Sequence, residues 1–393
     1  MGALLVASER KLSSFNSQDL ANTVWALATL GHNDAAFMGA LLVVVERKLP
    51  NFKPQALANT AWALATLGHR DATFMGALLV VAKPKLASFT VQDLANTVWA
   101  LSTLGYNDTA VMGALLVAAK PKLTSFNAQN LANTVWPLAT LGRKDAAFMQ
   151  AVLVAAEPKL ASFNAQDLAN TVWALATLGC NDAAFMDALL VVAESKLPSF
   201  TAQNLAKTAW ALAVLDAQNA AFVDALIRRL VTAARDFSPS AFCQLFQFML
   251  WLDTWQVATD LPPRLLKNCK QALLLAVGNT TASHTQLQVL DAVRQLPDCS
   301  GASSEHLTDD KLFSVDIAVQ LPCGQKLAVE VDGPTHFLSN VPTVPNGATR
   351  LRNRLLEARG WRVVSVPAKE WDRHFTKGKQ AAHDYLTSLG ACG

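Results

Sequence analysis

Three acidic residues and a histidine near the C-terminal end of the chain have the types and spacing of a site that cleaves phosphodiesters. Asp316 lies within the apolar run VDIAV, and Glu330 and Asp332 alternate with apolar residues in KLAVEVDG. Because alternate residues of a strand point to the same face of a sheet, Glu330 and Asp332 are predicted to lie together, with His336 just after the strand. Two carboxylates and a histidine can hold a divalent ion that activates water.

Carboxylates that are buried in a sheet need a partner, which is a metal ion, a proton or an arginine. The next basic segment, RLRNRLLEARG (350–360), offers Arg350, Arg352 and Arg354. We expect these arginines either to contact nucleic-acid phosphates or to neutralise the carboxylates.

Two interpretations of the acidic group stay open at this point. In the catalytic one, Asp316 and Glu330 hold Mg²⁺ or Mn²⁺ through oxygen ligands, His336 acts as a base or orients water, and Asp332 is a third ligand or an orienting group. In the other, the carboxylates are neutralised and the surface only binds, which requires no cofactor.

A second group of candidate residues recurs every 37 residues through the first half of the chain. One position is lysine in every copy, and one cation per repeat can follow a phosphate backbone. Lysine at the end of a helix also complements the helix macrodipole, so both roles are open. This lysine column comprises Lys11, Lys48, Lys85, Lys122, Lys159 and Lys196.

Another position changes between copies while it stays mostly polar. Asp only accepts hydrogen bonds, whereas Asn donates and accepts, which is the difference needed to distinguish base edges in a reader with one repeat per base. The alternative is stabilisation of a helix N-terminus, where acidic and capping residues are favoured. This Asp/Asn column comprises Asp19, Ala56, Asp93, Asn130, Asp167 and Asn204.

The repeats that carry these columns share the motif LANTVWALATLG, found at 20–31 and, with small changes, five more times at intervals of 37 residues. Such a period indicates a solenoid in which stacked neighbours share one core. Capping residues predict two helices per repeat. First helices are expected after Asp34, Asp71, Asp108, Asp145, Asp182 and Asn219. Second helices are expected after Asn16, Lys53, Thr90, Asn127, Asn164, Thr201 and Ser238, with glycines closing five of them.

Within the second helix, the pattern predicts a wide buried face and a small polar stripe on the remaining side. The predicted buried residues are Leu20, Val24, Trp25, Leu27 and Leu30.

Beyond the repeats, the pattern predicts three further regions. Residues 217–300 hold a decayed seventh repeat and helices that cap the stack, at 261–277 and 285–296. Residues 301–311 are a linker by composition. Residues 312–393 form a small α/β domain. Its predicted elements are strands at 311–321, 326–333 and 361–371, a loop at 337–348, and helices at 350–360 and 376–390.

Composition narrows the possible function classes. The chain has 393 residues and a net charge of +3, with 52% hydrophobic and 16% charged residues, which fits stacked helices. No apolar run reaches the roughly 18 residues that span a bilayer.

Six cysteines without CxxC spacing suggest reduced thiols. Residues 1–12 align with 38–49, so we expect the chain to begin within a first helix; no targeting peptide is visible, although one could lie upstream of Met1.

Two resemblances cover nearly the whole chain. The strings VDIAV, KLAVEVDGPTHF and RNRLLEARGWRVVSVPAKEW resemble the RAP domain, and the 37-residue repeats resemble octotricopeptide repeats. The resemblance implies an α-solenoid of helix-turn-helix repeats followed by an α/β domain of restriction-endonuclease-like type. It further implies sequence-specific binding of chloroplast or mitochondrial transcripts, with effects on their stability, processing or translation.

The RAP resemblance also bears on catalysis. Asp316 and Glu330 match the first two positions of a nuclease pattern whose third position is lysine, and Asp332 stands there instead. This departure favours binding over cleavage.

Three functions therefore remain in view. The first is an RNA-binding factor with single-stranded RNA as partner, and with other organellar RNA-maturation proteins as further partners. The second is a helical-repeat scaffold that binds protein. The third is a metal-dependent ribonuclease that the repeats guide. None of the three involves a membrane.

Overall fold

The computed structural model describes residues 2–233, 237–257, 261–277 and 282–391, so Met1 and Cys392 lie outside the described residues. The chain divides into two compact units. One comprises Met1–Ala174 with Asp187–Leu189, and the other comprises Leu175–Met186 with Leu190–Gly393.

The first unit consists of alternating first and second helices, as the repeat predicts. Four of these first helices, α3, α5, α7 and α9, begin where an Asp side chain accepts a hydrogen bond from the backbone N–H three residues later, which satisfies one of the free donors of the first turn. The first helices are α1 (Gly2–Glu9), α3 (Ala35–Lys48), α5 (Ala72–Ala82), α7 (Thr109–Ala119) and α9 (Ala146–Ala156). The second helices are α2 (Ser17–Thr29), α4 (Pro54–Thr66), α6 (Val91–Leu104), α8 (Ala128–Thr140) and α10 (Ala165–Leu178), of which residues 175–178 of α10 already belong to the second unit.

Short 3₁₀ turns join each first helix to the second helix of its repeat. They include η2 (Leu49–Asn51), η3 (Lys83–Ser88), η4 (Lys120–Ser125) and η5 (Glu157–Ser162). The glycines that follow the second helices have φ between +62° and +73°, the left-handed conformation that glycine adopts without strain.

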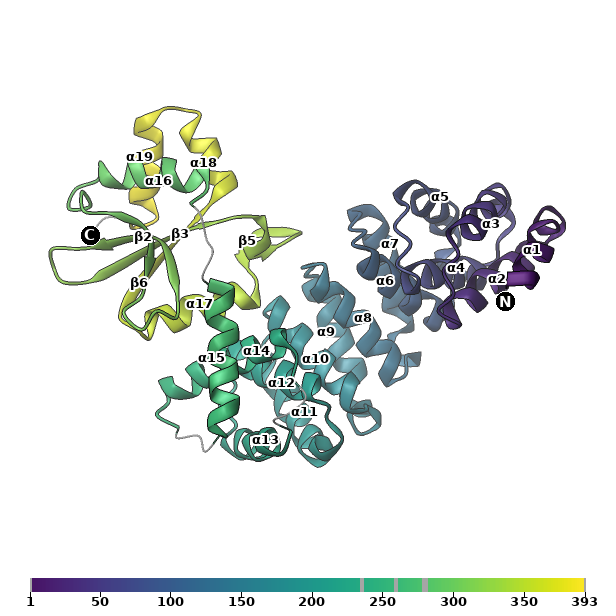
Figure 1. Cartoon of the computed structure of the whole chain (residues 1–393), viewed down its shortest axis with the longest axis horizontal. Helices are drawn as coiled ribbons and strands as arrows, with labels where there is room; N and C mark the ends of the chain where they lie inside the picture. The colour runs from purple at the N-terminus through teal and green to yellow at the C-terminus, as the bar shows by residue number, and fades with distance from the viewer. Residues whose placement is uncertain (1, 234–236, 258–260, 278–281, 392–393) are drawn as a thin grey trace. The chain divides into compact units, whose positions relative to one another are not determined.

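The second helices of the first unit form one continuous layer. Helices α2, α4, α6 and α8 pack on one another in chain order, whereas α7 and α9 contact the 3₁₀ turn of the preceding repeat. Figure 1 shows α3, α5 and α7 on one side of the unit and α2, α4 and α6 on the other. Leu20, Val24 and Leu27 are buried between the layers, as predicted.

The second unit continues the repeat pattern before it changes character. It contains most of α11 (Ala183–Lys196), then α12 (Ala202–Leu215), α13 (Ala220–Thr232), α14 (Pro239–Thr254) and α15 (Pro263–Val277). Helix α14 packs on α12, and the Trp210 Nε1–H donates to Gln247 Oε1, 37 residues later, at 2.8 Å.

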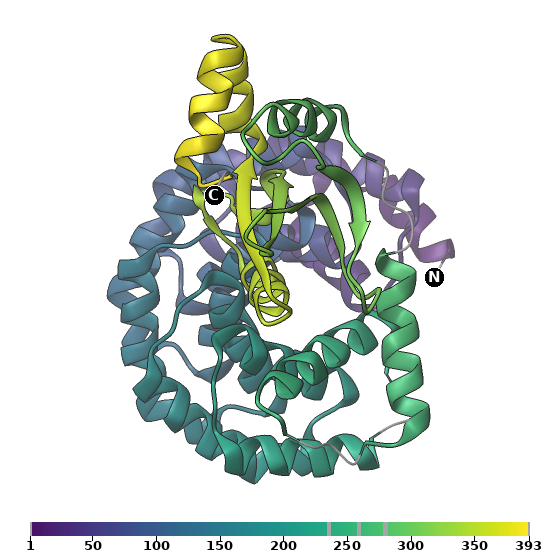
Figure 2. The same ribbon diagram turned by 90° about the vertical axis from the view of Figure 1, so that its left-hand side faces the viewer.

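The C-terminal part of this unit is a small α/β domain around one mixed sheet. The strand order is β1-β2-β3-β6, in which β3 and β6 are parallel and the other neighbours antiparallel. Figure 2 shows these strands gathered with the yellow C-terminal helices at one side. The strands are β1 (Ser303–Leu307), β2 (Ser314–Gln320), β3 (Lys326–Asp332) and β6 (Trp361–Pro367), and the helices are α16 (His284–Arg294), α17 (Gly347–Glu357), α18 (Ala368–Phe375) and α19 (Lys379–Ser388).

The core of this domain lies on one face of the sheet. Ile317, Val329 and Val366 meet α16, Trp371 and α19 there. The predicted architecture of helical repeats followed by a small α/β domain is confirmed.

Four sequence-based assignments in this region are wrong in detail. Residues 303–307 of the predicted linker form the edge strand β1, and α16, which was expected to cap the repeats, packs into the core of the α/β domain. The third strand ends at Pro367, where α18 begins. The predicted loop contains a small hairpin of β4 (Phe337–Leu338) and β5 (Val341–Pro345).

Within the described ranges, no helix combines the length and the apolar character needed to cross a bilayer. Among the described residues, Cys180, Cys243, Cys269, Cys299 and Cys323 form no disulfide bond.

Candidate functional sites

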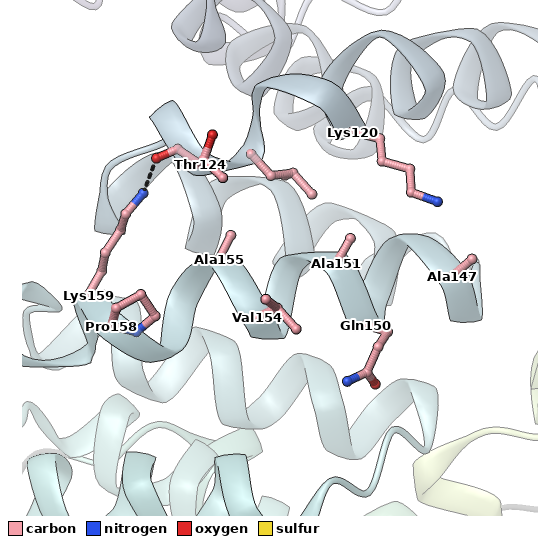
Figure 3. Close-up of a pocket in the computed structure, with 10 residues that line it drawn as sticks. Lys120, Thr124, Ala147, Gln150, Ala151, Val154, Ala155, Pro158 and Lys159 are labelled. Carbon is pink, nitrogen blue, oxygen red and sulfur yellow. Dashed lines mark hydrogen bonds between the residues drawn. The ribbon is translucent and has the colours of Figure 1, made fainter.

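The lysine column joins successive repeats through backbone carbonyls. The Nζ of Lys122 lies 2.8 Å from Ala87 O and 2.5 Å from Phe89 O, 35 and 33 residues earlier in the chain. Lys159 repeats this contact on Thr124 O and Phe126 O at 2.6 and 2.5 Å, the first of which is drawn in Figure 3.

The same pair of bonds is made by Lys48 and Lys85, and Lys196 occupies the equivalent position at the end of α11. A cation that satisfies two carbonyls of the neighbouring repeat explains why the residue is always lysine, because no uncharged side chain of that reach offers several donors. A contact between these lysines and RNA phosphate stays a prediction.

The Asp/Asn column lies in the first turn of the second helices and is largely engaged there. The carboxylates of Asp19, Asp93 and Asp167 accept a hydrogen bond from the backbone N–H of the capping residue three positions earlier, which closes a capping box. Asp93 and Asp167 are buried, and so is Asn204; Asn130 is half-buried. Helix capping therefore accounts for the acidic members, and base recognition by this column stays a prediction.

The structure exposes a different set of side chains on the second helices. In α6, only the line Gln92, Asn96, Trp99 and Thr103, with the two ends of the helix, escapes full burial. These residues have the spacing i, i+4, i+7 and i+11, which is one face of a helix. We call such a line the amide–indole stripe. Its other copies are Gln18, Asn22, Trp25 and Thr29; Gln55, Asn59, Trp62 and Thr66; Gln129, Asn133, Trp136 and Thr140.

The tryptophan of this stripe was assigned wrongly from the sequence. Trp25 is 44% exposed and Leu30 is 62% exposed, although both were predicted to be buried. Residue type suggested a core position, but Trp25 follows Asn22 by three residues and precedes Thr29 by four. That spacing places it on the polar side, and it is the signal that could have found it.

The predicted carboxylates do come together, on the face of the sheet opposite the main core. Asp316 lies on β2 beside Glu330 on β3, and its Oδ2 accepts from the Val331 N–H at 2.8 Å. Asp332 accepts from His336 Nδ1 at 2.9 Å and from the Ser365 hydroxyl.

Glu330 is the most constrained member of the group. It is buried, and its Oε2 pairs with Arg352 at 2.6 Å, while Arg352 also donates to Ser314 O at 2.7 Å. Burial raises the pKa of Glu330 to about 7, although the Arg352 charge opposes the shift. Its Oε1 is buried without a hydrogen-bond partner.

Two neighbours of Glu330 also have shifted titrations. Burial raises the pKa of Asp316, which the hydrogen bond from Val331 partly offsets. The hydrogen bond to Asp332 raises the pKa of His336, so the imidazolium is favoured.

The other two predicted arginines lie away from the carboxylates. Arg350 donates to Ala176 O at 3.0 Å, at the end of α10, and Arg354 donates to Ala213 O at 2.6 Å, at the end of α12. The two carbonyls are 37 residues apart, so α17 lies across equivalent carboxyl ends of two second helices. Cations are favoured there because the last carbonyls of a helix lack partners within it.

The acidic group does not fit a divalent cation in this arrangement. The guanidinium of Arg352 occupies one oxygen of Glu330 and supplies the positive charge that a metal would bring. Among the described residues, no group of three or more His, Cys, Asp or Glu has the geometry to hold a metal ion. Binding of a metal by Glu330 Oε2 or by Asp316 Oδ2 would require the release of Arg352 or of the Val331 N–H.

We expect Glu330→Gln to reduce the pH dependence of stability of the α/β domain. The pKa of Glu330 rises from 4.5 to about 7 on folding, so its stabilising proton is fully bound below pH 4.5 and is lost as the pH rises through 7. Across this pH range the parent is expected to lose about 3 kcal/mol of its free energy of unfolding. The Gln variant does not lose it, because glutamine does not titrate. Hydrogen exchange of β2 and β3 amides in both proteins at pH 5 and pH 8 measures it. A protection ratio that is the same at both pH values would contradict the raised pKa.

Two family models match successive parts of the chain. A family model described as the Tbc2 translation factor, N-terminal domain, matches residues 1–110 and 104–275. A RAP domain model matches residues 329–389, from within β3 into the last turns of the chain. A curated relative, a "RAP domain-containing protein, chloroplastic" from Oryza sativa subsp. japonica, is 38% identical over 65 residues.

The rice match covers 16% of this chain and 10% of the rice protein, so the chain spans only a small part of that relative's length. The Tbc2 match, in contrast, extends over the repeats and the helices that follow them. The chain therefore belongs to the family of the Tbc2 translation factor N-terminal domain, with a RAP domain at its C-terminal end.

Proposed function

We propose that this protein binds single-stranded RNA in an organelle and controls the stability, processing or translation of its transcripts. The observation that carries the proposal is the layer of second helices, which presents the same polar and aromatic side chains once per repeat. Helical repeats that read RNA in this way take one base per repeat. The family of translation factors and the chloroplast relative support an organellar role, in a chloroplast or a mitochondrion.

Other RNA-maturation proteins are the expected further partners. We propose further that the repeats are of the octotricopeptide type and that the protein binds RNA in a sequence-specific way.

The direct test is selection of bound RNA from a random single-stranded pool by the full chain. We expect tight binding at moderate salt, with affinity that falls as salt rises because phosphate contacts release counterions. Double-stranded RNA of the same length serves as the control and is expected to bind more weakly. Failure to bind any RNA at low or moderate salt would refute the proposal.

A second candidate function, binding of a protein, is favoured by the opposite layer. Each first helix exposes a valine at the same position, and these valines are between 51% and 74% exposed. They are Val6, Val43, Val80, Val117 and Val154. Val154 lines a pocket of about 610 Å³ with Ala151 and Pro158, open between Lys120 and Lys159 (Figure 3). Rows of exposed apolar side chains mark interaction surfaces.

RNA affinity of the parent chain and of a valine variant distinguishes RNA binding from protein binding. Val80→Ser/Val117→Ser/Val154→Ser is expected to leave RNA affinity unchanged if the second helices bind RNA. No enriched RNA and no tight RNA binding by the parent chain would favour the protein scaffold instead.

Cleavage is the weaker third candidate, because Arg352 holds Glu330. We expect bound RNA to stay intact with Mg²⁺ or Mn²⁺ in the parent chain, in Asp316→Asn and in Glu330→Gln. Cleavage by the parent that both substitutions abolish would make the RAP domain a nuclease and our preference wrong.

A further inference from the structure

The amide–indole stripe offers the same three kinds of contact in each of the first four repeats. An indole face takes a stacked base, an amide one helical turn earlier both donates and accepts, and a hydroxyl lies one turn later. In α4, α6 and α8 the indoles of Trp62, Trp99 and Trp136 are half-buried, so each ring is held in place while part of its surface meets solvent.

The hydroxyl of the stripe is held by the helix backbone. Thr66 donates to Trp62 O and Thr140 donates to Trp136 O, at 2.9 and 3.0 Å. In these two repeats the hydroxyl oxygen therefore has its proton committed and turns an acceptor outward, whereas the Thr103 hydroxyl oxygen in α6 is buried without a hydrogen-bond partner. The stripe is thus chemically defined and does not depend on side chains that must first be ordered.

The residues that vary between repeats lie to the side of this line or beneath it. Asp19 and Asp93 both close capping boxes; Asp93 is 5% exposed, whereas Asp19 is exposed and Asn130 is half-buried beside the stripe. The lysine column is committed to carbonyls of the preceding repeat. What successive second helices show to a ligand is consequently almost identical from one repeat to the next.

We infer that the amide–indole stripe is the base-contacting surface, and that it binds a run of one kind of nucleotide in single-stranded RNA at one base per repeat. This inference rests on the proposed function and sharpens it. To select different bases at successive positions, successive repeats must present different donors and acceptors. The four copies of the amide–indole stripe have the same residue types and do not provide this difference. Stacking adds affinity without selecting a base, since every base has a π-face.

The sixth repeat, in the second unit, lacks this surface. Lys207 replaces the asparagine, Val214 replaces the threonine, and Trp210 is buried with its Nε1–H bonded to Gln247. The stripe therefore depends on the asparagine and the threonine of the motif LANTVWALATLG, which the sixth repeat has lost.

The test compares affinities of the full chain for 20-nucleotide runs of A, U and C with those of mixed sequences selected from a random pool. We expect one of the runs to bind at least as tightly as the best mixed sequence. Trp62→Ala/Trp99→Ala/Trp136→Ala is expected to lower affinity for that run by at least about 100-fold, because three stacked bases are lost. Trp62→Phe/Trp99→Phe/Trp136→Phe keeps aromatic faces and is expected to lose less than about 10-fold.

The matched control is Val80→Ala/Val117→Ala/Val154→Ala, at the same pitch on the first helices, with circular dichroism and thermal unfolding of every variant. If the alanine variant does not fold, Asn59→Ala/Asn96→Ala/Asn133→Ala replaces it, and it is expected to lose the difference in affinity between the runs. RNA binding that is equal in the parent and in the folded tryptophan or asparagine variants refutes the stripe and leaves the proposed function intact. A mixed sequence that binds more than 10-fold more tightly than every run refutes uniform recognition. Absence of RNA binding by the parent refutes the proposed function itself.

Discussion

Lys85→Ala/Lys122→Ala/Lys159→Ala is expected to lower the free energy of unfolding of the first unit by about 3–6 kcal/mol. Each lysine makes two charge-assisted bonds to carbonyls of the preceding repeat, and its removal leaves them unpaired. Partial exposure of these lysines keeps the loss per residue near 1–2 kcal/mol. Urea unfolding followed by circular dichroism measures the loss.

The control for charge is Lys53→Ala/Lys83→Ala/Lys120→Ala, which removes three exposed lysines from three successive repeats of the same unit and is expected to change stability little. Salt titrations of RNA binding on the first triple variant then test the predicted phosphate contacts. We expect the slope of log affinity against log salt to change by less than about one, whereas three phosphate contacts to a single strand would change it by about two. If the variant showed a smaller salt dependence of RNA affinity and an unchanged free energy of unfolding, these lysines would contact phosphates instead of holding the repeats together.

Gly347→Ala is expected to destabilise the packing of α17 on the second unit by roughly 2–3 kcal/mol. A Cβ atom at this position would lie 2.5 Å from Ala176 O and 3.0 Å from the Thr177 Cα, and both are backbone atoms that cannot rotate away. Arg350 and Arg354 hold α17 against this same surface. Loss of hydrogen-exchange protection in α17, together with a lower midpoint of thermal unfolding, would register the effect.

Gly113→Ala is the matched control for this substitution. Gly113 is also helical, but a Cβ there meets nothing within 4 Å, so alanine is expected to be neutral or stabilising by about 0.5–1 kcal/mol. Equal behaviour of the two variants would show that α17 does not lie this close to α10.

The sequence predicted what local rules decide. The capping residues Asp34 and Asp71 begin helices because a short polar side chain satisfies the first free N–H groups, whatever the helix later packs against. In the α/β domain, alternation alone placed Glu330 and Asp332 on one face with Asp316.

The predictions that were wrong concern residues whose structure depends on contacts with distant parts of the chain. The amphipathic pattern of α16 indicates that one face is covered but not which surface covers it, and that surface is the sheet. Ser303–Leu307 has too few apolar residues to suggest a strand, because an edge strand needs only one neighbour. Arg350 was expected to contact either a phosphate or the carboxylates, yet its acceptor is a backbone carbonyl that lies 174 residues away in sequence.

The bonds of the lysine column have a consequence for how such a chain changes length over generations. Lys122 reaches only Ala87 O and Phe89 O in the repeat before it, and the equivalent carbonyls recur one repeat earlier at Pro50 and Phe52. Excision of 37 residues between equivalent points would therefore bring Lys122 onto Pro50 and Phe52 and recreate the same joint. Duplication would add a further joint of the same kind. Unequal recombination within the gene can thus lengthen or shorten the array one repeat at a time without leaving an unsatisfied carbonyl.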